Sequence, residues 1–241
     1  MITAVKNKVY TIKRYPTSVT LSDIFGITLL DIYIGKPSIK LKLLKKRCHH
    51  TVIIDLSKDS EELLQGCKSN TRNEIRRAMR EGVTFGYVDS INDFVEYYNA
   101  FAKEKGLDTI SRNNVAKYGS NLVLTKCMHE DKILSMHASL VDDESKRSSL
   151  LYSASIRLAE GVDRKLIGMS NRYLHYDDFL AFKERGCDSY DFSGVCNDPN
   201  QPEKYNIGIF KKSFGGEEVD QVSYASYPFL LAYAVKRLIR K

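Results

Sequence analysis

Several common signals are missing from this chain of 241 residues. It has no apolar run near the roughly 20 residues that a membrane-spanning helix needs. Its N-terminus also lacks the charged, apolar and small-residue zones of a signal peptide, so we expect a cytoplasmic protein. No linker rich in Pro, Gly or Ser and no internal repeat divides the sequence. We therefore expect one domain with a substantial core.

Signatures of disulfide, metal and nucleophilic chemistry are also missing. The five cysteines are odd in number and scattered, with no CxxC pair, so we expect reduced thiols rather than disulfides or a zinc site. His49 and His50 have no carboxylate or cysteine at ligand spacing, and we expect no metal. The sequence has no GxSxG motif, and none of its cysteines sits in a recognisable reactive motif, so nothing supports a serine or cysteine nucleophile.

Positive charge is in excess. The formal net charge is +7 and the isoelectric point is about 9.0, which suits an anionic partner such as CoA, a nucleotide-sugar, a tRNA or a lipid surface. A solvated basic surface explains the charge equally well. The basic residues do not alternate with aromatics in a known nucleic-acid motif, which gives little support to a nucleic-acid module.

Residue patterns predict alternating strands and helices. We expect strands at 10–15, 27–34, 51–56, 83–88, 122–128, 133–141, 149–156, 187–195 and 218–224, and a strand and turn at 39–47. A helix begins after the N-cap Ser57 through residues 60–62, and the clearest helix spans 63–81. Further helices are expected at 91–105, 111–118, 168–185, 207–214 and 229–240, with loops at 158–167 and 197–206.

Four sequence blocks carry a family resemblance. They are residues 54–57 (IDLS), 70–78 (NTRNEIRRA), 190–194 (YDFSG) and 210–216 (FKKSFGG), joined by Asn171, Arg172 and His175. In this order they resemble the Fem family of peptidoglycan bridge-forming aminoacyltransferases, within the GNAT acyltransferase superfamily. Fem proteins carry two tandem GNAT-like domains, whereas this chain has room for one. The resemblance therefore favours the single-domain relatives of surface-polysaccharide pathways.

The resemblance implies an α/β (α+β) chain with a GNAT-like fold. Such a fold has a mixed, mostly antiparallel central sheet flanked by helices. We expect one domain over residues 1–241, with extra N-terminal strands over 1–50, the Fem-like core over 51–226 and a C-terminal helix over 227–241.

The resemblance also implies an acyltransferase. Such an enzyme would move an acyl group from acyl-CoA to an amine, or a hydroxyl, of a sugar or lipid-linked glycan precursor in cell-surface polysaccharide synthesis. One alternative is a Fem-type enzyme that uses aminoacyl-tRNA. Another is a non-catalytic basic module that binds nucleic acid or anionic lipid. The sequence also leaves two partners open: peripheral contact with the inner membrane surface, and assembly into a homo-oligomer.

A donor site is expected at residues 165–170 (KLIGMS), between a strand and a helix. This segment resembles a degenerate form of the GNAT acyl-CoA loop, Q/R-x-x-G-x-G/A, in which backbone amides at a helix N-terminus bind a pyrophosphate. An ordinary loop explains the segment equally well. The expected donor-binding residues are Lys165, Gly168, Met169 and Ser170.

An acceptor site is expected around the end of the strand at 187–195. Asp191 would orient or deprotonate the acceptor, or else cap the turn at Ser193 and Gly194. His137 and His175 are candidate bases, with hydrogen-bonded core histidines as the alternative. The expected catalytic residues are Asp191, His137 and His175, and the expected substrate-binding residues are Asn171, Arg172, Tyr176, Ser193, Lys211 and Lys212.

Overall fold

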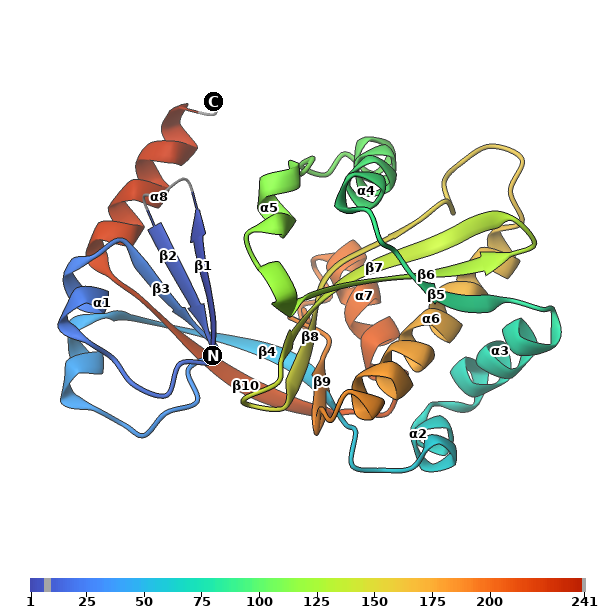
Figure 1. Ribbon diagram of the computed structural model, residues 1–241, viewed down its shortest axis with the longest axis horizontal. Coiled ribbons are helices and arrows are strands. Elements are labelled where there is room, and N and C mark those ends of the chain that lie inside the picture. Colours follow the sequence, from blue (N-terminus) through green and yellow to red (C-terminus); the bar gives the residue numbers. More distant parts are fainter. Residues whose placement is uncertain (7–9, 240–241) are drawn as a thin grey trace. The chain divides into compact units, whose positions relative to one another are not determined.

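The chain forms two compact units (Figure 1). The computed structural model describes residues 1–6 and 10–239. Unit 1 comprises Met1–His50 and Val219–Lys241, and unit 2 comprises Thr51–Glu218. Strands β4 (Lys45–Asp55) and β10 (Glu217–Ala225) contribute residues to both units. The division after residue 50 coincides with the expected start of the core, and the expectation of a single domain stays a prediction.

Unit 1 is built on strands in the order β1-β2-β3-β10. Their bounds are β1 Ile2–Lys6, β2 Tyr10–Arg14 and β3 Thr28–Asp31, and β1 was not predicted. The β1–β2 and β3–β10 pairs are antiparallel, and β2–β3 is parallel. The helices of this unit are α1 (Leu21–Phe25), the 3-10 helix η1 (Ile39–Leu43) and α8 (Tyr227–Ile239).

The strand expected at the start of residues 39–47 is wrong, because η1 occupies residues 39–43. The alternating IKLKL sequence fits a half-buried strand, but only Leu41 of these residues is buried. Leu41 packs in a small cluster with Ile24 of α1 and Leu30 of β3. Ser38 caps η1, since its hydroxyl accepts a hydrogen bond from the backbone N–H of Lys40 at 3.4 Å.

Unit 2 contains a sheet with the strand order β4-β9-β8-β7-β6-β5. The bounds are β5 Thr84–Tyr87, β6 Leu122–His129, β7 Lys132–Asp142, β8 Arg147–Ser155 and β9 Ser189–Asp191. All neighbours are antiparallel except β8 and β9. The predicted mixed, mostly antiparallel sheet flanked by helices is therefore confirmed.

Helices cover both faces of this sheet. They are α2 (Ser60–Gly66), α3 (Ser69–Arg80), α4 (Ile91–Lys105), α5 (Arg112–Ala116), η2 (Gly119–Asn121), α6 (Arg164–Glu184) and α7 (Pro202–Lys212). In Figure 1, α4 lies above strands β6 to β8 and α6 lies below them. Met136 and Ala138 of β7 pack with Phe94 of α4, whereas His137 between them hydrogen-bonds to Asp178 of α6. The alternation of β7 thus buries its polar side chains under α6.

Three helix predictions need correction. The helix expected from residue 207 begins at Pro202, so the last part of the loop expected at 197–206 is helical. The helix expected over 63–81 is two helices, because the chain is extended at Cys67 (φ −65°, ψ 146°). The backbone N–H of Lys68 donates to the carbonyl of Ser213 at 2.8 Å, so a distant segment holds this break. The helix expected from residue 168 begins at Arg164, so part of the expected loop is helical.

None of the helices within residues 1–6 and 10–239 combines the length and apolar character needed to cross a membrane.

Candidate active site

Strands β8 and β9 run side by side for three residue pairs and then separate. The last pair is Ser149 with Asp191, where β9 ends. β8 continues to Ser155, still paired with β7. The sheet of unit 2 therefore opens along one side of β8 beyond Ser149 and Asp191. Crevices past strand ends are where open α/β sheets bind ligands.

A β-bulge lies in β8 beside this opening. Ala138 of β7 pairs with Tyr152, but the next residue, Ser139, pairs with Leu150. Leu151 is therefore the extra residue, without a partner in the β7 register. Bulges interrupt the ladder and are frequent next to active sites, because they redirect the backbone. The bulge places a peptide group outside the regular ladder on the strand that borders the opening.

Asp191 holds the turn that follows β9. Its carboxylate accepts hydrogen bonds from Thr51 Oγ1 at 2.5 Å and from the backbone N–H of Ser193 at 2.8 Å. Thr51 Oγ1 in turn accepts the N–H of Gly194 at 3.1 Å. Ser193 and Gly194 both have positive φ, 56° and 76°, and a non-glycine residue in that region needs such support. Of the two expected roles for Asp191, the geometry shows the turn cap.

Lys211 of α7 binds the same turn from the other side. Its ammonium group donates to the carbonyl oxygens of Ser193 at 2.9 Å and Gly194 at 2.7 Å. Burial lowers the pKa of Lys211 to about 8, although the negative charge of Asp191 acts against this shift. An ammonium has three donors, and two are used here. Lys211 therefore brings a partly buried positive charge and one further donor to the end of β9.

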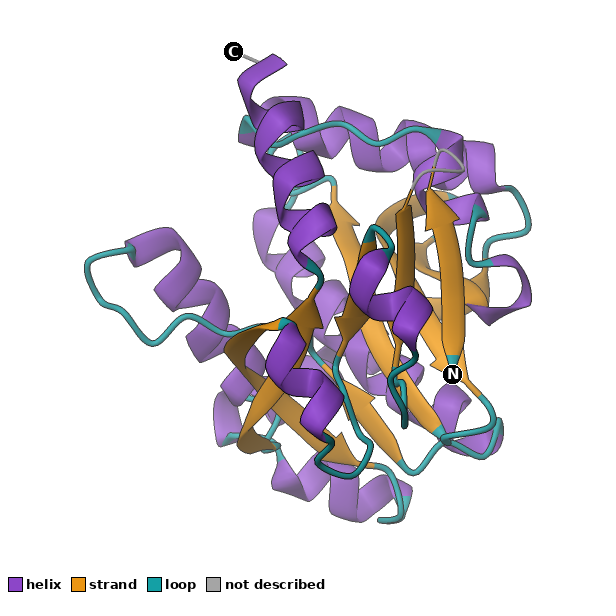
Figure 2. Ribbon diagram, turned by 90° about the vertical axis from the view of Figure 1, so that its left-hand side faces the viewer, coloured by secondary structure: helices purple, strands orange, loops and turns teal. Residues whose placement is uncertain are grey.

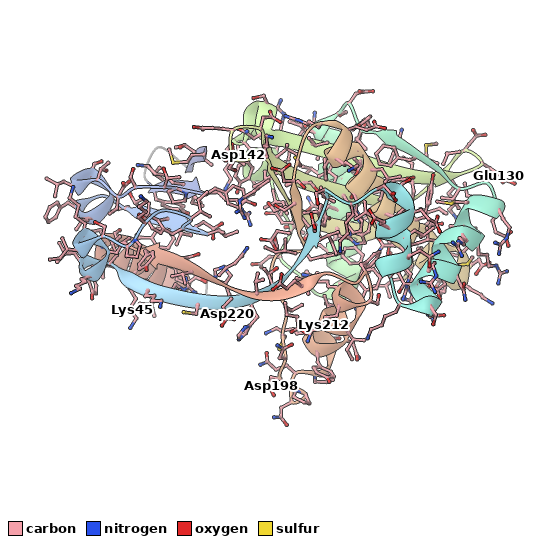
Figure 3. All side chains as sticks on the ribbon, turned by 90° about the horizontal axis from the view of Figure 1, so that it is seen from below. Lys45, Glu130, Asp142, Asp198, Lys212 and Asp220 are labelled. Carbon is pink, nitrogen blue, oxygen red and sulfur yellow. The ribbon has the colours of Figure 1, made fainter. Side chains whose placement is uncertain are left out.

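Lys212 does not reach this turn. Its ammonium pairs with Glu218 at 2.9 Å and donates to Asn197 Oδ1 at 2.8 Å. Figure 3 shows Lys212 on α7, near the loop that carries Asp198. Only one of the two adjacent lysines therefore belongs to the candidate site.

A buried polar network crosses from the sheet to α6. Nδ1 of His137 lies 2.7 Å from Asp178 Oδ2, and Thr125 donates to Asp178 Oδ1 at 2.7 Å. Nε2 of His137 lies 3.2 Å from Asn171 Oδ1. His137 and Asp178 are fully buried, so these contacts satisfy groups that would otherwise be costly to bury. The geometry shows the hydrogen-bonded core histidine, not an exposed base.

His175 lies against His137, with ring centroids 4.2 Å apart. Its ring also contacts Phe192, Phe210 and Phe214 at centroid distances of 5.0 to 5.6 Å. Burial holds the pKa of His175 well below its usual range, and the charges of His137, Lys211 and Arg172 act in the same direction. His175 is therefore a neutral ring within an aromatic cluster.

His137, His175 and Asp178 also form a group with metal-ligand spacing, since one ligand atom from each lies within 4.8 Å of the others. The group fits a metal ion poorly. Nδ1 of His137 and Asp178 Oδ2 are already at hydrogen-bond distance, and the second oxygen of Asp178 accepts from Thr125. An ion would have to break these contacts, so we derive no chemistry through a metal.

The expected donor loop is not a loop. Lys165, Gly168, Met169 and Ser170 lie in the first two turns of α6, and Ser170 donates its hydroxyl back to Leu166 O at 2.8 Å. The helix N-terminus is capped by Asp163, whose carboxylate accepts the N–H groups of Lys165 and Leu166 at 2.8 and 3.1 Å. These two amides lower the pKa of Asp163. An acidic side chain thus occupies the position where a pyrophosphate was expected.

Arg172 and Tyr176 contact other elements rather than the opening. Arg172 pairs with Glu74 of α3 at 3.0 Å and lies 4.9 Å from the ring centroid of Phe210. Tyr176 donates to the carbonyl of Ser60 at 2.9 Å, and burial raises its pKa to about 12. Both side chains therefore connect α6 to its neighbouring helices.

The structure brings together Asp191, Ser193 and Lys211 at the end of β9, with Asn171, His137 and His175 in the adjoining core. Sequence reasoning missed Thr51, Asp178 and the bulge at Leu151. Asp178 follows Asn171 by seven residues, two helical turns, and this spacing places both on one face of α6. That spacing was a usable signal for Asp178. No local pattern identifies Thr51 or the bulge, because both depend on strand pairing.

No known protein family matches this sequence, and no curated protein matches it either. Solved structures do match. FemX superimposes with a TM-score of 0.63 at 17% identity, over 77% of this chain and 63% of the FemX chain. L-PGS from Bacillus licheniformis gives a TM-score of 0.60 at 12% identity, over 100% of this chain and 86% of the other. The C-terminal domain of a putative lysylphosphatidylglycerol synthetase from Agrobacterium fabrum gives 0.54 at 12% identity, over 81% and 66%.

This chain thus spans less than two thirds of the length of FemX. At these identities the likeness concerns the arrangement of the backbone. The expected resemblance to the Fem family is confirmed in the fold, since FemX has the same arrangement of the backbone.

Proposed function

We propose that the protein is a Fem-like acyltransferase, which moves an activated acyl group onto an amine, or a hydroxyl, of a sugar or lipid-linked glycan precursor. The observation that carries this proposal is the opening between β8 and β9, with the bulge at Leu151 on one side and the Asp191 turn on the other. The opening supplies a strand-end crevice, and the bulge supplies backbone polar groups beside it.

The chemistry requires few side chains. The acceptor nitrogen or oxygen forms a bond to the acyl carbon, and the bond from that carbon to the sulfur of acyl-CoA or to the ester oxygen of aminoacyl-tRNA breaks. The proton that the acceptor loses ends on this leaving atom. The protein has to position both substrates and stabilise the negative charge that develops on the carbonyl oxygen. In this proposal the peptide N–H at the Leu151 bulge polarises the carbonyl. Lys211 holds an anionic group of the substrate through its remaining donor, and Asp191 keeps the turn in place. His137 and His175 support α6 from inside the core.

Two donors suit this fold, and Asp163 bears on the choice. An acyl-CoA bound at the start of α6 would bring its pyrophosphate to amides that the Asp163 carboxylate already occupies. Two anions at one helix N-terminus repel each other. This favours the Fem-type aminoacyl-tRNA donor over the acyl-CoA that the sequence favoured.

The test is a pair of transfer assays run in parallel. The protein is incubated with acceptor amino sugars and either labelled aminoacyl-tRNA or labelled acetyl-CoA. We expect transfer from the tRNA and none from acetyl-CoA. Transfer from acetyl-CoA alone reverses the donor assignment, and transfer from neither contradicts the proposed function.

The site is tested by a matched pair at the bulge. Leu151→Pro removes the peptide N–H, whereas Leu151→Ala keeps it and shortens only the side chain. We expect the proline variant to lose about 100-fold in kcat, the cost of removing one donor to a developing oxyanion. The alanine variant should stay near the parent, with circular dichroism confirming that both are folded. Equal activity of the two variants removes the bulge from the mechanism.

A further inference from the structure

The excess positive charge of the chain lies entirely in unit 1. Residues 1–50 and 219–241 contain 14 Lys and Arg against 3 Asp and Glu, a net charge of +11. Residues 51–218, which contain the candidate active site, have 23 against 27, a net charge of −4. The charge of +7 is therefore no general property of the surface. It belongs to the part of the chain outside the candidate active site.

Each of the three acidic residues of unit 1 pairs with a residue outside the group of lysines at positions 40 to 46. Asp23 pairs with Lys13 at 2.6 Å, Asp31 with Arg14 at 3.6 Å, and Asp220 with His50. Lys40, Lys42, Lys45 and Lys46 are all exposed, and none has an ion pair in the described part of the chain. Figure 3 shows Lys45 on the outside of the ribbon. These lysines follow or lie within η1.

Exposed apolar side chains occur on the same elements. Phe25 at the end of α1 is 75% exposed, and Ile39 at the start of η1 is 77% exposed. α8 has an exposed stripe at steps of three and four residues. It consists of Tyr227, Leu231, Val235 and Leu238. Since the opposite side of α8 is apolar as well and packs on α1 and β3, this helix is apolar nearly all round. A helix of that kind is normally covered on every side.

The elements that carry these side chains are neighbours in unit 1. α1 and η1 cover the same cluster, which contains Ile24, Leu30 and Leu41, and α1 also contacts α8. Figure 2 turns α1 and α8 toward the viewer. We name their exposed residues the basic–apolar face. It consists of Leu21 and Phe25 of α1, Ile39, Lys40, Lys42 and Leu43 of η1, and Tyr227, Leu231, Val235 and Leu238 of α8.

We propose that the basic–apolar face docks on an anionic lipid bilayer. Apolar side chains interleaved with lysines suit the boundary between headgroups and acyl chains, where the lysines meet lipid phosphates and the leucines and Phe25 enter the acyl region. The proposal is independent of the proposed function, because it concerns unit 1 and can be measured without acyl transfer.

Two other occupants fit less well. A second copy of the chain would bring a second net charge of +11 against the first, and like charges oppose that contact. A tRNA would meet the lysines through its phosphates, but it has no apolar surface that could cover the exposed aliphatic side chains of α1, η1 and α8. A bilayer alone satisfies both the charge and the aliphatic side chains.

The test is co-sedimentation of the full chain with lipid vesicles. One set is pure phosphatidylcholine and the other an equal mixture with phosphatidylglycerol. We expect binding to the anionic vesicles only. Leu231→Glu and Phe25→Glu, on two different helices, should each weaken binding about tenfold, because each removes an exposed apolar side chain that the bilayer would bury and adds a charge that the anionic lipids repel.

Leu107→Glu is the matched control. Leu107 is 50% exposed and lies in unit 2, so the same substitution there should leave binding unchanged. All three positions are on the surface, and unchanged thermal unfolding confirms that the variants fold. Absence of vesicle binding by the parent, or equal binding by all variants, overturns the proposal. A dimer that Leu231→Glu dissociates, or tRNA binding without vesicle binding, overturns it in favour of those occupants.

Discussion

Adjacent residues of the same type have different roles in α7. Lys211 donates to the turn after β9, while Lys212 pairs with Glu218 and Asn197 at the surface. The two lysines therefore form a matched pair for mutation, since the same change is made one residue apart.

We expect Lys211→Gln to lower kcat/KM by about 10- to 100-fold, because it removes a charge-assisted contact to the turn and to the substrate anion. Lys212→Gln should change it less than about threefold, since exposed ion pairs contribute little. The pKa of Lys211 is about 8, so activity that needs its positive charge should fall as the pH rises through 8. Equal losses in the two variants would remove Lys211 from the site.

His175 links stability to pH. The folded-state pKa lies well below 6.5, because the ring is buried. As the pH falls through about 6.5, the unfolded chain takes up a proton that the folded chain does not, so this group costs stability below that pH. The maximal slope for one group is about 1.4 kcal/mol per pH unit.

His175→Phe keeps an aromatic ring among Phe192, Phe210 and Phe214 and removes the titration. We expect the variant to lose less stability than the parent between pH 7 and pH 5, measured by urea unfolding. The parent protein, measured in parallel over the same pH range, gives the reference slope. A slope in the His175 variant as steep as the parent's would contradict the argument.

The sequence identified Asp191, Ser193 and Lys211 as candidates because they lie in the YDFSG and FKKSFGG blocks. It could not decide between the two roles of Asp191. That decision depends on Thr51, which is 140 residues away and donates to the carboxylate only once β4 and β9 are paired. Local sequence thus gives the candidates, and tertiary pairing decides their roles.

At the scale of elements, the break between α2 and α3 shows how a distant segment overrides helix propensity. The periodicity over 63–81 suits one helix, but residues 213–215 approach the chain at Gly66 and Cys67. A Cβ on Gly215 would lie 1.9 Å from the carbonyl oxygen of Gly66. No local pattern encodes such a contact, which explains why helix 91–105 was predicted correctly and helix 63–81 was not.

This contact predicts a large cost for Gly215→Ala. Gly215 and Gly82 both have φ of +81°, but a Cβ on Gly82 meets no atom within 4 Å. Gly82→Ala should therefore show the conformational cost alone, about 1 to 2 kcal/mol. Gly215→Ala adds the clash and should exceed about 3 kcal/mol in urea unfolding. Similar losses of unfolding free energy in both variants would mean that the α2–α3 junction moves to accommodate the added Cβ at no further cost in stability.

At the scale of the whole molecule, charge and function are divided between the two units. Unit 1 has a net charge of +11, and unit 2, with the candidate active site, has −4. The net charge of the whole sequence does not indicate this division, because the division depends on which distant segments fold together. The excess positive charge that led us to expect an anionic partner is therefore carried by unit 1.

We expect binding to phosphatidylglycerol vesicles to weaken by at least about tenfold between about 0.1 and 1 M salt, because screening shortens the Debye length from about 10 to 3 Å. The variant Phe25→Glu should bind more weakly at both salt concentrations and keep this salt dependence. Replacing Lys40, Lys42, Lys45 and Lys46 together by Gln should reduce the salt dependence of binding. Salt-independent binding would show that the lysines do not take part.

The assignment of both ends of the sequence to unit 1 has a consequence for biosynthesis. Leu30 of β3 pairs with Tyr224 of β10, almost two hundred residues later. During translation the first fifty residues leave the ribosome long before β10 exists, whereas residues 51–218 are then synthesised as one continuous stretch. Unit 2 can therefore begin to fold on the nascent chain, while β3 waits for its partner until β10 has been synthesised. Chaperones that hold exposed strand edges would meet this protein at its N-terminal strands.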